Sequence, residues 1–481
     1  MVFILNPSGG GLDLCLEENR KTTNQKMTEH SGLKIHNASF RDPDASVFRG
    51  SDNKVYRQIN NSYKEHFDLL LSSGLYKKLV EKKMLVSHQE KNEIIFDVAS
   101  FYKTLFPEQI ECISYPYEWS FSMLKDAALL TLEIMKESLS SGMILKDASP
   151  FNVQFVNGKP VFIDTSSFEK YIDGKPWIAY RQFCENFLGP LLLMRYRNME
   201  MNKMLIIYPD GIPVKMISSL LPFKSVFNSG ALMHIHFQSL VKSGKGNSKV
   251  ENVLTLKRLL AIIDHLRSCI RNLTPGKSAS EWENYYEEDI LSNEYLRSKI
   301  DIVEEVISEL NVTTALDMGS NTGVFSELLA KRNINVVSTD TDPVCIDDLY
   351  KKGNKNILPL VLDFTSPTPA TGWANSERSS FWQRCNVDLI LALALIHHLS
   401  IGKNISFKML AEKLADSCKL LIIEFVPKSD PKVQMMLQSR KDIFSNYSKE
   451  KFEEEFVKHF MIEKQQQVSD SGRVIYLLRK K

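Results

Sequence analysis

Short apolar runs alternate with helix-like segments through the last part of the chain. The runs are TTALD, NVVSTD, ILPLVLD, VDLILALAL and KLLIIEFV, at residues 313–317, 335–340, 357–363, 387–395 and 419–426. Nearly continuous apolar strands are typical of a parallel sheet that helices cover on both faces. The pattern predicts an α/β, Rossmann-like doubly wound domain over residues 281–481. MIEK and RVIYLLR, around a polar turn, predict an antiparallel pair at its end.

The preceding residues show a mixed pattern, which predicts an α+β domain over residues 34–273. SVF and VYRQI flank turn residues 50–53 and predict a hairpin. Helical spacing covers residues 62–82 and begins again near Ser120, where Gly142 supplies a stop. Residues 274–280 carry Pro, Gly and Ser and predict a linker between the domains. Residues 1–33 are polar, without sustained periodicity, and predict a flexible tail.

Composition narrows the class of protein. The chain of 481 residues is too long for a single domain with one hydrophobic core. Its 43% hydrophobic and 25% charged residues are typical of a globular protein. Sixty Lys and Arg nearly balance 58 Asp and Glu, so no nucleic-acid partner is expected and a small or neutral substrate fits better. Seven scattered cysteines without a CxxC pair predict a reducing compartment and no zinc site. With no long apolar run and a poor signal-peptide pattern at the start, we expect a cytoplasmic protein without membrane insertion.

The strongest chemical signal is the segment LDMGSNTG at residues 316–323, between a predicted strand and a predicted helix. Glycines at such a turn let the backbone approach a ligand, and the helix N-terminus offers N–H groups to a carboxylate. Dinucleotide binding through G-x-G-x-x-G is disfavoured, because Asn321 and Val324 stand where glycines would be needed.

Acidic residues follow the next two strands. Asp340 ends the second strand about 20 residues after the glycines, where folds of this type bind a ribose diol. Asp363 ends the third strand and could accept a hydrogen bond from an adenine amino group. A single acid at a strand end often only caps a turn, but three at successive strand ends beside a glycine turn favour a nucleoside site.

In this order the motifs resemble those of class I S-adenosylmethionine-dependent methyltransferases. More specific phrases resemble the NoeA-like family of these enzymes, which is named for a nodulation protein: YPYEWSFSMLKDAALL, LKDASPFNVQF, VFIDTSSFE, WIAYRQFCENFLGPLLL, LDMGSNTGVFS, LALALIHHL and IIEFVPKSD. The resemblance implies S-adenosylmethionine as cofactor and a methyltransferase activity. It also implies that the methionine part is held by Asp317, Gly319, Asn321 and Gly323, the ribose by Asp340 and the adenine by Asp363.

The fourth strand runs into Ile396-His397-His398, and the resemblance implies that the cofactor's sulfonium lies opposite this strand end. His397 is a candidate general base for an acceptor hydroxyl, since histidine titrates near neutral pH. A packing or capping role is an equal alternative. The expected acceptor is a small molecule or a saccharide.

A second candidate site lies in the earlier domain. Asp147 and Asn152 stand at D-x-x-x-x-N spacing, and Asp164 follows an Asn157-Gly158 hairpin signal. The set resembles the catalytic loop and metal-binding Asp of kinase-like phosphotransferases. No glycine-rich phosphate loop and no convincing strand lysine accompanies it; Arg57 is the nearest basic residue. The readings left open are a structural loop, a degenerate kinase-like lobe and an ATP-dependent phosphotransferase, beside a non-catalytic cofactor-binding scaffold.

Two further groups of residues give weaker evidence of a functional site. His234 and His236 favour packing over metal binding, because no third ligand is near in sequence. Trp282, Tyr285 and Tyr286 either cover the cofactor or pack between domains.

Overall fold

The computed structural model describes residues 32–240, 254–276, 293–438, 441–469 and 471–481. By their internal contacts they form two compact units, one of residues up to 65 together with 87–109 and one of residues 66–86 together with 110–481. Nearly all of the predicted tail and more than half of the predicted linker lie outside the described residues. The boundary at 274–280 therefore stays a prediction.

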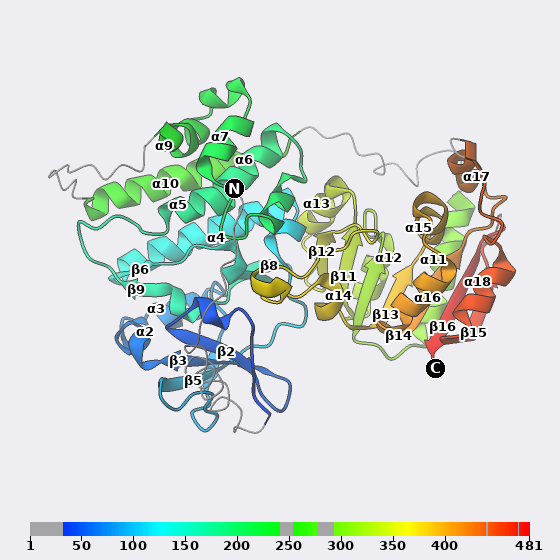
Figure 1. The fold of residues 1–481 in the computed structure, drawn as a ribbon, viewed down its shortest axis with the longest axis horizontal. Coiled ribbons are helices and arrows are strands. Elements are labelled where there is room, and N and C mark those ends of the chain that lie inside the picture. The colour runs from blue at the N-terminus through cyan, green and yellow to red at the C-terminus, as the bar shows by residue number, and fades with distance from the viewer. Residues whose placement is uncertain (1–31, 241–253, 277–292, 439–440, 470) are drawn as a thin grey trace, which may run out of the picture. The chain divides into compact units, whose positions relative to one another are not determined.

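The first unit is built on an antiparallel sheet of five strands in the order β1-β2-β3-β5-β4 (Figure 1). Its strands are β1 (Lys34–Ile35), β2 (Ala45–Arg49), β3 (Val55–Asn60), β4 (His88–Glu90) and β5 (Phe101–Pro107). The pairing of β2 with β3 confirms the predicted hairpin. Phe48 and Ile59 are fully buried on this sheet.

The second unit begins with a mostly helical part. Its elements are α2 (Lys64–Ser72, which starts in the first unit), α3 (Leu75–Glu81), α4 (Phe121–Ser140), β6 (Met143–Leu145), β7 (Val153–Val156), β8 (Lys159–Phe162), β9 (Phe168–Lys170), α5 (Tyr180–Phe183), α6 (Gly189–Tyr196), α7 (Val214–Leu220), α8 (Ser229–Ala231), α9 (Phe237–Leu240) and α10 (Leu256–Asn272). The predicted helix over 62–82 is broken in two, because Gly74 adopts a left-handed φ of 77° before α3. The helix from Ser120 is confirmed, with the Ser120 side chain accepting from the Met123 N–H as N-cap.

The rest of the second unit is the predicted doubly wound α/β domain. Seven strands lie in the order β12-β11-β10-β13-β14-β16-β15, parallel except for β16, which is antiparallel to both neighbours. The strands are β10 (Thr314–Met318), β11 (Asn335–Asp340), β12 (Ile357–Val361), β13 (Val387–Ala392), β14 (Cys418–Phe425), β15 (Phe460–Gln467) and β16 (Val474–Lys480). The helices are α11 (Asn293–Ser308), α12 (Val324–Lys331), α13 (Pro343–Lys351), α14 (Phe381–Arg384), α15 (Ile396–Lys403), α16 (Phe407–Ala415), α17 (Pro431–Gln438) and α18 (Lys449–Phe456) (Figure 1).

Alternate residues of the parallel strands enter two separate cores, one on each face of the sheet. Leu389 and Leu391 of β13 belong to the core that α11 and α12 cover, whereas Ile390 and Ala392 belong to the other. This alternation explains why the strands are apolar without a period of two in sequence. The predicted strand over 387–395 ends earlier than expected, at Ala392, because Ala394 takes a left-handed φ of 52°.

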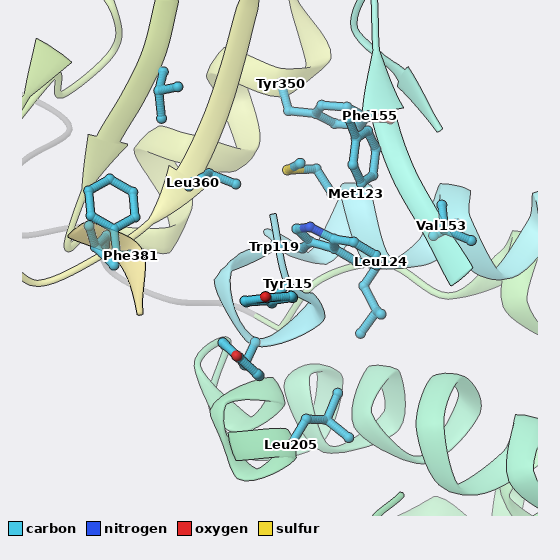
Figure 2. Close-up of a cluster of buried hydrophobic side chains, with 14 of the residues drawn as sticks. Tyr115, Trp119, Met123, Leu124, Val153, Phe155, Leu205, Tyr350, Leu360 and Phe381 are labelled. Atoms are coloured by element: carbon cyan, nitrogen blue, oxygen red, sulfur yellow. The ribbon is translucent and has the colours of Figure 1, made fainter. Parts of the chain in front are cut away.

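The core on the second face of the sheet is continuous with the core of the helical part. Figure 2 shows Trp119, just before α4, and Met123, in the first turn of α4, in one cluster with Tyr350 and Leu360 of the α/β domain. Phe155 of β7 meets Tyr350 edge to face, at 5.7 Å between ring centroids.

Polar contacts fix the same junction. Arg384 forms a buried ion pair with Glu118, and the exposed fractions of the two side chains are 6% and 1%. Glu118 also accepts from the Thr368 hydroxyl, and Asp347 accepts from the backbone N–H and hydroxyl of Ser122 at 2.7 and 3.0 Å. The helical part and the α/β domain therefore share apolar burial and charge pairing.

Candidate cofactor site

The glycine turn after β10 follows a tight left-handed path. Gly319, Asn321 and Gly323 have φ values of 73°, 49° and 86°. The N–H groups of Gly319 and Ser320 both donate to the Thr339 carbonyl of β11, at 2.9 Å each. A side chain added at Gly319 would meet only Leu395, at 3.4 Å, so the backbone is open on that side. The turn thus offers bare backbone at the carboxyl end of β10, as the sequence predicts.

Replacing Gly323 by alanine is expected to destabilise the protein by about 2 to 5 kcal/mol. The left-handed backbone contributes about 1 to 2 kcal/mol of this, and crowding contributes about 1 to 3 kcal/mol. The crowding arises because the new Cβ would lie 2.5 Å from Cδ1 of the buried Leu349. Gly353→Ala is the matched control, because its φ is 69° and its Cβ would meet nothing within 4 Å. Urea unfolding that gave equal losses for both variants would contradict the packing argument.

Asp317 is the acid nearest the turn. Its side chain is 2% exposed, and Oδ2 accepts from the Ser326 hydroxyl of α12 at 2.6 Å. Burial raises the pKa of Asp317 to about 6, although the Ser326 hydrogen bond works in the other direction. The charged carboxylate is therefore held at an electrostatic disadvantage, which a bound cation would relieve.

The other two predicted acids lie at the carboxyl ends of the neighbouring strands. Asp340 binds the turn directly, since Oδ2 accepts from the Asn321 N–H at 2.8 Å and Oδ1 accepts from the Asp342 N–H at 2.9 Å. Asp363 follows Leu362, whose N–H donates to the Asp340 carbonyl at 2.8 Å. Because β12, β11 and β10 are adjacent parallel strands, the structure brings Asp363, Asp340 and Asp317 to one edge of the sheet.

The end of β13 forms the opposite side of this edge. Ala394 donates its N–H to Glu424 Oε2 at 2.7 Å, and the next residue, Leu395, approaches Gly319. Sequence reasoning missed Glu424, although its signal was visible: it is the one charged residue in IIEFV, and an acid inside a buried strand needs partners.

Those partners come from distant parts of the chain. Lys299 Nζ lies 2.7 Å from Glu424 Oε2, and the Tyr295 hydroxyl donates to Oε1 at 2.8 Å. Arg473 donates to the Tyr295 hydroxyl at 2.7 Å and pairs with Asp430 at 2.7 Å. Burial alone would raise the pKa of Glu424, but the charges of Lys299 and Arg473 outweigh it and lower that pKa below its ordinary value. Glu424 is therefore a carboxylate at neutral pH.

His397 lies at the start of α15 and is completely buried. Neither ring nitrogen has a hydrogen-bond partner among the described residues. Burial, followed by the charges of His398, Arg473 and Lys299, lowers the pKa of His397 well below its ordinary value. The ring is neutral at physiological pH and retains two unsatisfied polar atoms.

The second candidate site is held together by local hydrogen bonds. Asp147 Oδ1 accepts from the Ser149 N–H at 2.9 Å and from Gln182 Nε2 at 2.7 Å. Asn152 Nδ2 donates to the Ser167 hydroxyl at 3.2 Å, and that hydroxyl donates to Asp164. Asn152 and Asp164 are thus linked through Ser167, at the loop beside the β7–β8 hairpin that Asn157-Gly158 predicts, while Asp147 is held by Ser149 and Gln182. This pattern fits the structural reading of the loop.

Of the remaining candidate residues, the structure describes the two histidines but not the three aromatic residues. His234 is hydrogen-bonded to Tyr180 and His265 at 2.7 Å each, and His236 to Ser218 and Ser225, which fits packing. The aromatic residues at 282, 285 and 286 lie outside the described residues. Within the described part of the chain, no group of three or more His, Cys, Asp or Glu side chains could hold a metal ion, and no helix is long and apolar enough to cross a membrane.

Comparison with known proteins tests the family that the sequence motifs indicate. No family model matches the chain. Nodulation protein NoeA of Rhizobium meliloti (strain 1021) is 32% identical over 454 residues, which cover 91% of this chain and 94% of the relative. Among solved structures, the PH0226 protein from Pyrococcus horikoshii OT3 is 17% identical, covering 41% of this chain and 99% of that chain with a TM-score of 0.30. N-methyltransferase NodS from Bradyrhizobium japonicum WM9 is 12% identical, covering 39% and 98% with a TM-score of 0.30. Identity over nearly the whole of both chains shows that this chain belongs to the family of nodulation protein NoeA.

Proposed function

We propose that the chain transfers a methyl group from S-adenosylmethionine to a small-molecule or saccharide acceptor. The observation that carries the proposal is the edge where Asp317, Asp340 and Asp363 lie at or within two residues of the carboxyl ends of three adjacent parallel strands, beside the open backbone of Gly319. Carboxylates accept hydrogen bonds and attract cations, and the cofactor presents an ammonium group, a sulfonium, a ribose diol and an adenine amine. This set of carboxylate acceptors therefore fits S-adenosylmethionine.

Each residue has a role in the proposed complex. Asp317 would pair with the ammonium group, the turn from Gly319 to Gly323 would accommodate the methionine part, and Asp340 and Asp363 would accept from the ribose and the adenine. Bound S-adenosylmethionine would supply an electrophilic methyl group. The protein's contribution would be to exclude water and to align the acceptor with that methyl group.

His397 remains our candidate for the general base. Its two unsatisfied ring nitrogens support the role, because one of them could accept a proton. The lowered pKa of the buried ring makes it a weaker base than an exposed histidine. His397→Gln should slow methyl transfer while leaving cofactor affinity unchanged. A loss of stability with normal transfer would instead assign the ring to packing.

The affinity for S-adenosylmethionine should fall about tenfold between pH 7 and pH 5. Asp317, with a pKa of about 6, is ionised at pH 7 and mostly neutral at pH 5, where it no longer attracts the ammonium group. Isothermal titration across this range measures the effect, and Asp317→Asn should flatten it. A pH-independent affinity in the unsubstituted protein would contradict the role of Asp317.

The same shift has a consequence for the cofactor-free protein. A carboxyl group whose pKa is raised by folding is protonated more readily in the folded state than in the unfolded state. The free energy of unfolding should therefore decrease as pH rises from the ordinary value of 3.8 to about 6. Asp317→Asn should remove this contribution.

Methyl transfer itself is tested with S-adenosylmethionine labelled in its methyl group. The protein is incubated with the labelled cofactor and a cell extract, and the products are separated by size. We expect label in the low-mass or saccharide fraction. Label no higher than with heat-denatured protein would count against the proposal, and label in the protein fraction would move the acceptor class.

An ATP-dependent phosphotransferase remains the alternative, through Asp147, Asn152 and Asp164. It has less support, because no glycine-rich phosphate loop and no convincing strand lysine accompanies these residues in the sequence. Loss of ATP-linked turnover in Asp147→Asn with methyl transfer retained would reveal two independent activities.

A further inference from the structure

The turn that joins β13 to α15 has an unusual backbone. Ala394 adopts a left-handed φ of 52°, and Leu393 and Ile396, on either side of the turn, are buried. An alanine in this conformation is strained relative to ordinary backbone, because its Cβ lies too close to the following carbonyl oxygen. Such strain persists only where the surroundings hold it in place, and it occurs often at functional sites.

The turn matters because it faces the glycine turn. Cδ1 of Leu395 lies 3.4 Å from the position that a Cβ on Gly319 would occupy. His397 begins two residues later. A shift of residues 393–395 would therefore change the space over Gly319, where the proposed function puts the methionine part of the cofactor.

The side chain of Glu424 holds this turn through a hydrogen bond. Glu424 accepts the Ala394 N–H at 2.7 Å and is itself completely buried. Lys299 at 2.7 Å and Tyr295 at 2.8 Å fix its two oxygens, and both side chains project from α11, more than 100 residues earlier in the chain. A carboxylate with both oxygens engaged in a buried network has little freedom to move.

We propose that Glu424 is a positioning residue, which fixes the turn at residues 393–395 against the glycine turn and so sets the shape of the cofactor site. The inference rests on the proposed function. It assigns to the ion network of Lys299, Glu424 and Arg473 a purpose beyond stability, since Glu424 also accepts the Ala394 N–H of the turn.

Three variants separate positioning from stability. Glu424→Ala removes both the charge and the acceptor for the Ala394 N–H. Glu424→Gln has the same length and keeps a neutral oxygen acceptor while losing the charge. Asp430→Asn is the matched control, because it weakens the far side of the network at Arg473 without touching the turn.

Affinity for S-adenosylhomocysteine is measured by titration at a temperature where all variants are folded, beside amide hydrogen exchange of peptides that contain Ala394. Glu424→Ala should weaken binding about tenfold, which corresponds to the free energy of about one hydrogen bond. It should also accelerate amide exchange at the turn, because the Ala394 N–H loses its acceptor. Asp430→Asn and Glu424→Gln should lower the melting temperature. Their affinities should stay within about threefold of that of the unsubstituted protein, a smaller change than the loss of one hydrogen bond would cause. If Glu424→Ala does not fold, the double variant Lys299→Met with Glu424→Met removes both charges together and takes its place.

Two results would overturn the inference: unchanged affinity and exchange in Glu424→Ala, or an equal loss of affinity in Asp430→Asn. The first would leave Glu424 without influence on the turn, and the second would reduce its effect to general stability. If the unsubstituted protein does not bind S-adenosylhomocysteine, the proposed function fails, and the exchange comparison alone decides whether Glu424 holds the turn.

Discussion

Replacing Arg384 by alanine is expected to lower the free energy of unfolding by about 3 to 5 kcal/mol, the loss typical of a buried ion pair that is deprived of one partner. Its partner Glu118 has a side chain that is only 1% exposed, so the carboxylate left behind could not be solvated by water. Arg384 also donates to the Ile113 carbonyl and stacks on the Tyr115 ring at 4.4 Å. The variant therefore loses hydrogen bonds and packing as well as charge.

An exposed ion pair supplies the control. Lys464 Nζ and Glu309 Oε1 lie 2.6 Å apart, and 38% and 53% of the two side chains are exposed. Because water solvates both charges, Lys464→Ala should lower the free energy of unfolding far less than Arg384→Ala. Urea unfolding of both variants gives the comparison. The double variant Glu118→Gln with Arg384→Met should recover much of the loss, because no charge is left buried. Equal small losses for Arg384→Ala and Lys464→Ala would show that the buried pair contributes nothing at the junction.

Asp340→Ala is expected to reduce the affinity for S-adenosylhomocysteine about 100-fold. Two charge-assisted hydrogen bonds to a ribose diol contribute together about 3 kcal/mol, and each 1.4 kcal/mol corresponds to a factor of about ten. Asp340 also accepts the Asn321 N–H, so its removal would loosen the glycine turn as well. At a fixed ligand concentration, the thermal stabilisation by the ligand should disappear.

Asp348→Ala is the matched control for this prediction. Asp348 is an acid of α13, within ten residues of Asp340, but its side chain is 49% exposed and pairs with Lys351. Its removal should leave the affinity unchanged. Equal affinities for Asp340→Ala and the unsubstituted protein would remove Asp340 from the site.

The α/β domain could be predicted well from sequence because its signals are local. Strands buried on both faces are apolar throughout, and each strand from β10 to β14 lies within one of the predicted runs to within a residue or two, except that β13 ends three residues early. The acids at 317, 340 and 363 could be assigned to one edge because parallel strands bring their carboxyl ends together. The left-handed Ala394 could not be foreseen, since alanine gives no sign of that conformation and the Glu424 bond that holds it comes from another strand.

Pairings between distant residues escaped prediction for the same reason. Glu118 and Arg384 are 266 positions apart, and each alone reads as a surface charge. The first unit joins residues up to 65 with 87–109 because β3 pairs with β5 across an intervening helical segment. The sequence pattern of a strand predicts that the strand is paired in a sheet, but it does not identify the partner strand.

The central claim, that the edge formed by Asp317, Asp340 and Asp363 binds an adenosyl cofactor, is tested most directly by isothermal titration of the full chain with S-adenosylhomocysteine at neutral pH. We expect saturable binding with one ligand per chain. An absence of binding to S-adenosylhomocysteine, with binding of magnesium-ATP in the same buffer, would contradict it.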